Sequence, residues 1–295
     1  VFVLAYIFFK FYETKDRNAL LNALVFFGIG VLFASPQIFP SIELYLNASR
    51  SVIFQKIEAV GLFHLPTIIA PDFYGNPVTR NDFFGHYIEW NGFFGVIPFL
   101  LAIYALFARS KKILFFVAAS IVSLILCLNT PIVDLLVNLK IPVFSTSALG
   151  RILVIFSFSG AVLSAFGLDL IKKDLESNRY KKIVIWLSIT LGIFIFLWTI
   201  VLLKIIDPSF HTVASRNLIL PSILLFGLML SLVLAGIRKN LISLFLLILI
   251  FLTAFDMLRF ATKWQPFESK KLTFVETPII NKLLSLDNTH RTLGP

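Results

Sequence analysis

The sequence predicts an all-α protein that crosses a membrane several times. Of its 295 residues, 58% are hydrophobic and 14% are charged, whereas soluble domains are roughly 45–50% apolar. Apolar runs of about twenty residues recur along the chain, and a helix of that length spans a hydrocarbon core of about 30 Å. The net charge of +10 is explained by basic loops beside the spans, so no nucleic-acid partner is expected.

Eight transmembrane helices are predicted, the first of them truncated. In chain order they cover residues 1–9, 19–40, 92–107, 113–128, 152–171, 183–203, 218–236 and 241–258. Gly28, Gly30 and Pro36 are tolerated inside the second span where neighbouring helices cover the backbone. Because the chain opens at Val1 without a basic leader and ends in a polar tail, we expect an internal fragment of a longer protein.

Two short helices are predicted outside the spans. Thr130-Pro131 and Thr277-Pro278 each resemble an N-cap followed by proline at the first helical position. The apolar residues that follow recur at helical spacing. The helix after Thr130 is too short to span, so it is expected to lie at the membrane interface or to dip back into the protein.

The loop charges predict the orientation. Thirteen of the 26 Lys and Arg fall in four short loops of about 28 residues in total, at 10–18, 109–112, 172–182 and 237–240. Basic residues are retained on the cytoplasmic side, so the remaining segments are predicted to face outward. The domains expected are a transmembrane domain at 1–258, with outer loops 41–91, 130–151 and 204–216, and the start of a truncated extracytoplasmic region at 259–295.

The sequence lacks the motifs of most soluble enzymes. It contains no Gly-rich phosphate loop, HExxH, CxxC or GxSxG pattern. The four histidines have no ligand-like spacing, and the single cysteine, Cys127, allows no disulfide framework. Acidic residues avoid the middle of the spans and gather in the outer segments, with Asp169 and Asp256 expected near span ends. This pattern favours a reaction at the outer face over an ion-coupled transporter.

Five motifs resemble, in order and spacing, those of the bacterial YfhO membrane protein family. They lie at 35–44 with Arg50, at 71–75, at 87–95, at 141–144 with Arg151, and at 256–258 with 265–266 and Arg291. They are similar to the family patterns lP-x-x-E…S-x-R, P-D-f-f-G, Y-x-E…Y-x-G, P-x-f…f-R…R and D-L…n-P…R. The resemblance covers essentially the whole chain, as the middle of a longer protein.

The resemblance implies a glycosyltransferase-like protein of the C class (GT-C), which uses a polyprenyl-phosphate sugar as donor. Such a protein lies in the bacterial plasma membrane and glycosylates an envelope polymer, such as lipoteichoic acid, on the outer face. Its implied partners are membrane lipids, the lipid-linked donor and the polymer acceptor. The C-class pattern places a catalytic Asp in the first outer loop, before residue 1, so enzyme activity and the need for a divalent metal stay open.

Two acids of the outer loops are the candidate catalytic residues. Asp72, in Pro71-Asp72-Phe73, is expected to order an acceptor hydroxyl or a metal; alternatively it caps its own turn. Glu89 is expected to bind acceptor hydroxyls; alternatively it forms a structural ion pair at the membrane edge. In this chemistry a carboxylate base and cationic phosphate partners lie at the interface.

Four further residues are candidates for substrate or phosphate binding. Arg50 and Arg151 match phosphate bidentately, or else only snorkel at the interface. Glu43 is a weaker candidate that would otherwise pair with Arg50. His86 would otherwise be a polar surface group.

Two other functions remain open. A transporter or flippase for a lipid-linked envelope intermediate would be favoured by paired half-helices interrupted at mid-membrane. An outer cavity lined by Asp72, Glu89, Arg50 and Arg151 would favour the enzyme. A non-catalytic scaffold for envelope synthesis is the third alternative.

Overall fold

A computed structural model describes most of the chain. The described residues are 1–48, 56–78, 86–108, 110–141, 144–264, 269–270 and 277–285. Across these ranges the regular elements are helices, and β-structure is limited to two isolated bridges. The chain divides into two compact units, Val1–Met257 and Leu258–Pro295. The prediction of an all-α protein is confirmed for the described residues.

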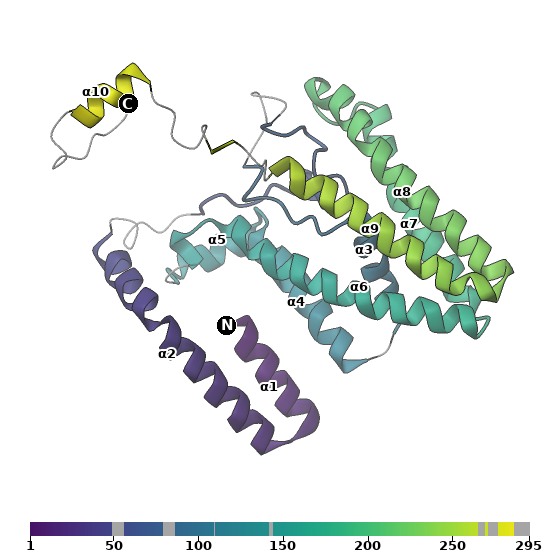
Figure 1. Cartoon of the computed structure of the whole chain (residues 1–295), viewed down its shortest axis with the longest axis horizontal. Coiled ribbons are helices and arrows are strands. Elements are labelled where there is room, and N and C mark those ends of the chain that lie inside the picture. Colours follow the sequence, from purple (N-terminus) through teal and green to yellow (C-terminus); the bar gives the residue numbers. More distant parts are fainter. Residues whose placement is uncertain are drawn as a thin grey trace. The chain divides into compact units, whose positions relative to one another are not determined.

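The helices are labelled along the chain in Figure 1. The α-helices are α1 Phe2–Thr14, α2 Arg17–Asn47, α3 Val96–Ala105, α4 Lys111–Cys127, α5 Pro131–Asn138, α6 Leu153–Glu176, α7 Tyr180–Leu202, α8 His211–Ile237, α9 Ile242–Trp264 and α10 Pro278–Ser285. Short 3-10 helices are η2 Leu62–Ile68, η3 Phe144–Thr146, η4 Leu149–Ile152, η5 Pro208–Phe210 and η6 Lys239–Leu241.

Within the described part of the chain, five helical segments are long and apolar enough to cross a membrane. They are Arg17–Asn47, Leu149–Glu176, Tyr180–Leu202, Pro208–Ile237 and Lys239–Lys263. The other three predicted spans form the shorter helices α1, α3 and α4, of 13, 10 and 17 residues. A multi-pass helical membrane protein follows from the five long helices.

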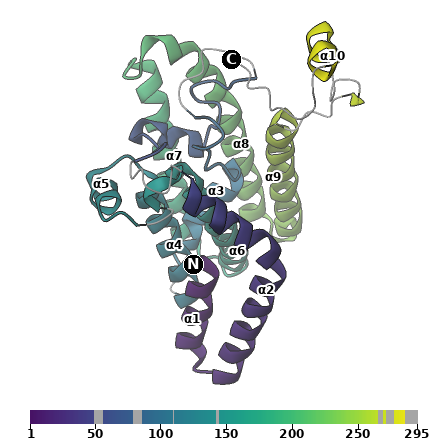
Figure 2. The ribbon, with the colours of Figure 1, turned by 90° about the vertical axis from the view of Figure 1, so that its left-hand side faces the viewer.

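Helix α2 is longer than the predicted span. The sequence analysis ended the second span at Pro40, but α2 passes through Pro36 and Pro40 and ends at Asn47. Asp16 starts this helix by accepting hydrogen bonds from Asn18 N and Ala19 N, the usual role of an aspartate N-cap. Helices α1 and α2 form an antiparallel hairpin (Figures 1 and 2).

Helix α3 lies at the centre of the first unit. It packs mainly against α6 and also touches α7 and α8. A Cβ at Gly167 of α6 would lie 1.9 Å from Leu101 O, so only glycine permits this approach of the two helices. The indole of Trp186 donates to Leu100 O at 2.8 Å. Eight of the ten α3 residues are therefore buried.

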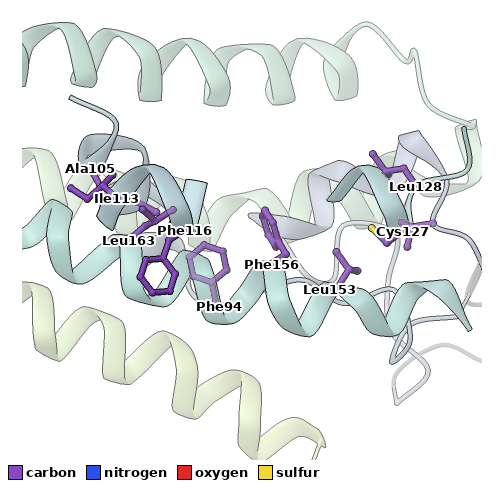
Figure 3. Close-up of a cluster of buried hydrophobic side chains, with 11 residues drawn as sticks. Phe94, Ala105, Ile113, Phe116, Cys127, Leu128, Leu153, Phe156 and Leu163 are labelled. Carbon is purple, nitrogen blue, oxygen red and sulfur yellow. The ribbon is translucent and has the colours of Figure 1, made fainter. Parts of the chain in front are cut away.

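A cluster of buried hydrophobic side chains joins α3, α4 and α6. Phe94, Ile113, Phe116, Phe156 and Leu163 belong to it, and Figure 3 shows their side chains between the helices. Cys127 and Leu128 extend the cluster to the end of α4. Because lipid chains are as apolar as these side chains, close van der Waals packing between the helices is what stabilises the cluster.

The two predicted short helices form at the predicted places. Ile280 N donates to Thr277 Oγ1 at 3.2 Å, which confirms that cap. Thr130 occupies the N-cap position of α5 with Pro131 directly after it, as predicted, although the Thr130 side chain makes no capping hydrogen bond. In α5, Val133 and Val137 are buried, whereas Leu135 is exposed.

The predicted outer loop 204–216 is largely helical. Helix α8 starts at His211, after the 3-10 turn η5. Asp207 starts that turn because its carboxylate accepts a hydrogen bond from Ser209 N at 2.9 Å. The span was predicted to start at residue 218, because the polar residues among 211–217 favour a loop, but these residues form the first two turns of α8.

Candidate functional site

Loops cover the end of the bundle where α4 ends and α3, α6 and α8 begin. We call residues 56–78, 86–95 and 144–152 the loop layer. Val60 N donates to Cys127 O at 2.8 Å, and Leu149 N donates to Ile57 O at 3.0 Å. Tyr45 of α2 shares a hydrogen bond of 3.0 Å with Thr146. These bonds bring parts of the predicted loops 41–91 and 130–151 together.

Asp72 is held inside the loop layer. A 3-10 helix, η2, precedes it, and Gly75 N donates to Asp72 O at 2.7 Å with a left-handed φ of 93°, a conformation that suits glycine. Only 4% of Asp72 is exposed. Its Oδ1 accepts a hydrogen bond from Tyr87 Oη at 2.7 Å, and its backbone oxygen accepts one from Asn217 Nδ2 of α8 at 2.6 Å.

Glu89 and Arg151 form a two-pronged ion pair. Arg151 Nε and Nη2 donate to the two carboxylate oxygens of Glu89 at 2.9 and 2.8 Å. Gly150 allows the approach, since a Cβ there would lie 2.3 Å from Glu89 O. These hydrogen bonds lower the pKa of Glu89 below its usual value. The Arg151 side chain is 68% exposed, so the remaining guanidinium N–H groups face outward.

The other predicted site residues do not all join this pair. His86 lies beside it, with its ring 5.4 Å from the Trp90 ring. Glu43 lies on α2 with an exposed side chain, and its recorded hydrogen bond is through its backbone oxygen, from Asn47 Nδ2. Arg50 lies outside the described residues.

His64 is a buried residue of the loop layer that the sequence analysis did not select. It is 3% exposed, and the rings of Trp90, Phe63 and Tyr74 lie 4.6, 5.0 and 5.2 Å from its own. Burial lowers the pKa of His64 to about 4 and raises that of Tyr74 to about 12. His64 is therefore neutral near pH 7.

A small cavity of about 10 Å³ connects these groups. It is lined by His64, Thr67, Pro71, Tyr87, Trp90 and Asn91. This volume is close to the minimum that one water molecule occupies, and the lining offers polar partners for it. Asp72, Glu89 and Arg151 are not among its lining residues, so this is not the cavity expected from the sequence.

The described residues contain no group of three or more His, Cys, Asp or Glu side chains able to hold a metal ion. The two partners of Asp72 differ in their distance along the chain, because Tyr87 belongs to the loop layer and Asn217 belongs to α8. Tyr87 appears in a family-like motif, but no sequence signal points to Asn217, which lies 145 positions from Asp72.

Asp256, which is predicted near a span end, lies on α9 and contacts the first residue of α3. Asp256 is 3% exposed, and its Oδ2 accepts a hydrogen bond from Val96 N at 2.9 Å. A carboxylate at the first turn of α3 stabilises the helix dipole. Its contact with α3 explains how a charge is accommodated inside an apolar helix.

Comparisons with protein-family models, with curated proteins and with solved structures gave no match for this chain.

Proposed function

We propose that this chain is the membrane part of a C-class, YfhO-like glycosyltransferase. It transfers a sugar from a polyprenyl-phosphate donor to an envelope polymer, such as lipoteichoic acid, on the outer face of the bacterial plasma membrane. The proposal includes eight spans and an outward loop layer. The observation that supports it most is that Asp72, Tyr87, Glu89 and Arg151 gather at one end of helices able to cross a membrane.

The proposed reaction forms one bond and breaks one. An acceptor hydroxyl oxygen attacks the anomeric carbon, the bond from that carbon to the phosphate oxygen breaks, and its electron pair leaves with the phosphate. The hydroxyl proton passes to a carboxylate base, which the family resemblance places before residue 1. No soluble nucleotide takes part.

The residues of this chain then act on the donor and acceptor. Arg151 binds the donor phosphate with the N–H groups that Glu89 leaves open, because a guanidinium offers five donors in a planar fork. Glu89 holds that guanidinium in place, and acceptor hydroxyls bind beside it. Asp72 orients the Tyr87 phenol by accepting its hydrogen bond. His86, Arg50 and Glu43 complete the binding surface.

The test is sugar transfer from a polyprenyl-phosphate donor by the full-length protein in vesicles. Asp72→Ala removes the acceptor of the Tyr87 phenol, and Glu89→Gln removes the charge that holds Arg151. Each should lower transfer by about a hundredfold, the lower end of the scale for losing one positioned acid or base. Asp134→Ala is the matched control, because Asp134 is an exposed acid that pairs with Lys56 near the same loops. Transfer at the wild-type rate by both Asp72→Ala and Glu89→Gln would remove these residues from the site.

A transporter for a lipid-linked intermediate is the second candidate, and α3 is the observation that favours it. At 1.5 Å per residue its ten residues span about 15 Å, half of the hydrocarbon core. The chain is not helical at Gly92, just before α3, although it already lies against the bundle there: Gly92 O accepts a hydrogen bond from Ser157 Oγ in the second turn of α6. A helix of this length resembles one member of the paired half-helices that are typical of transporters. Movement of the donor across vesicles that lack acceptor, unaffected by Glu89→Gln, would favour transport.

A further inference from the structure

Two turns rich in basic residues lie side by side at the end of the bundle opposite the loop layer. We call residues 172–182 and 237–241 the basic end. They include the α6–α7 and α8–α9 turns, which two hydrogen bonds hold together. Tyr180 Oη donates to Gly236 O at 3.2 Å, and Lys239 Nζ donates to Glu176 O at 2.9 Å.

The basic end has a large excess of positive charge. Its acids are Asp174 and Glu176, and its basic residues are Lys172, Lys173, Arg179, Lys181, Lys182, Arg238 and Lys239. Asp174 is fully buried, where it accepts from Tyr104 Oη at 2.7 Å and pairs with Arg179 Nε at 2.9 Å. Within the described ranges, Lys172, Lys173, Lys181, Lys182 and Arg238 have no carboxylate within 4.0 Å.

The start of α7 adds to this excess. Its first turn contains Lys181 and Lys182 but no acid, and the N-cap residue Arg179 makes no side-chain capping bond. Cations are unfavourable near a helix N-terminus, whereas an anion there is stabilising. The two lysines therefore add positive charge where the helix end is already positive.

The surface next to these charges is apolar. Val184 and Ile185 of α7 and Val233 and Ile237 of α8 are exposed, by 59%, 41%, 52% and 73%. The turns of the basic end join helices that are long and apolar enough to cross a membrane, so they lie at the level of the lipid headgroups. Basic side chains suit the phosphate of a phospholipid headgroup, and the exposed aliphatic side chains beside them suit its acyl chains.

We propose that the basic end binds an anionic phospholipid. Its phosphate is held between Lys181 and Lys182 on one turn and Arg238 and Lys239 on the other, and its acyl chains lie along α7 and α8. Lipid phosphates near the membrane surface attract each Lys or Arg by about 1 kcal/mol, which is roughly a fivefold change in affinity. This inference does not rest on the proposed function, because it concerns the opposite end of the bundle.

The test is native mass spectrometry of the full chain in detergent, titrated with phosphatidylglycerol or phosphatidylcholine. The variant Lys181→Gln/Lys182→Gln should lower the affinity for phosphatidylglycerol roughly 25-fold and leave that for phosphatidylcholine unchanged. The matched control is Lys111→Gln/Lys112→Gln, which removes two lysines from the start of α4 and should keep the preference. An excess of inorganic phosphate should not displace the lipid.

Three results would overturn the proposal. They are an equal loss of phosphatidylglycerol affinity in both double variants, no preference of the wild-type chain for phosphatidylglycerol, and displacement of the lipid by inorganic phosphate, which would indicate a site for free phosphate.

The salt dependence of wild-type binding provides a measurement without any substitution. Affinity for phosphatidylglycerol should fall as the NaCl concentration rises, because salt screens exposed charges, and an affinity independent of salt would also contradict the proposal.

Discussion

The loop layer and the basic end use the same charged residue types in opposite ways. In the loop layer, Asp72 and Glu89 each accept hydrogen bonds from a defined partner, Tyr87 and Arg151. At the basic end a single acid, Asp174, is buried and bonded, while most lysines lack a carboxylate partner. One end is thus organised by internal bonds, whereas the other presents basic side chains without carboxylate partners.

The largest expected effect is a pH dependence that belongs to the loop layer. Burial lowers the pKa of His64 from 6.5 to about 4, so the folded state favours the neutral ring. Between these values the unfolded chain binds a proton that the folded chain does not. Stability is therefore full above pH 6.5 and falls as the pH is lowered, by roughly 3 kcal/mol at pH 4.

The measurement is the unfolding free energy in detergent from pH 7.5 to 4.5, compared between the wild type and His64→Phe. The aromatic neighbours of His64 can accept a phenyl ring, and the variant should lose most of the slope between pH 6.5 and 4.5. His86→Gln, at an exposed histidine of the same layer, should keep the wild-type slope. An unchanged slope in His64→Phe would show that another group carries the pH dependence.

The second effect concerns the single buried acid of the basic end. Asp174→Ala leaves the buried phenol of Tyr104 without its acceptor, which should cost about 1–3 kcal/mol of stability. Asp174→Asn keeps an acceptor oxygen and should cost less. Thermal unfolding in detergent checks both, and sugar transfer by any folded fraction should stay normal. Equal stability of wild type and Asp174→Ala would mean that the Tyr104 bond contributes nothing.

The contrast between the two ends also explains what the sequence could predict. The basic end was identified from composition, since Lys172, Lys173, Lys181 and Lys182 are neighbours in the chain. The long helices follow from apolar runs, although Pro40 was wrongly taken as the end of α2. Proline removes only one backbone donor, and α2 continues for almost two further turns.

The loop layer was predictable only in part. Asp72, Glu89 and Arg151 were selected from the sequence, but their partners depend on long-range packing. Asn217 reaches Asp72 because α8 begins seven residues earlier than predicted, and His64 is buried by rings that no local pattern brings together. The capping of α3 by Asp256, across 160 positions, likewise has no signal in either segment alone.

The smallest expected change in stability is at the Glu89–Arg151 pair, and it separates a structural pair from a functional one. Because Arg151 is 68% exposed, Glu89→Gln should cost only about 0.2–1 kcal/mol of unfolding free energy. If the pair is only structural, the exchanged variant Glu89→Arg/Arg151→Glu should restore both stability and transfer. If Arg151 contacts the donor phosphate, the exchange restores stability while transfer stays low, since the carboxylate then occupies the position that faces the phosphate.

Arg151→Lys should also keep most stability and lower transfer, because an ammonium cannot bind Glu89 and a phosphate through the same planar fork. Normal transfer by the exchanged variant would therefore reduce this pair to a brace for the loop layer, however large its effect on folding.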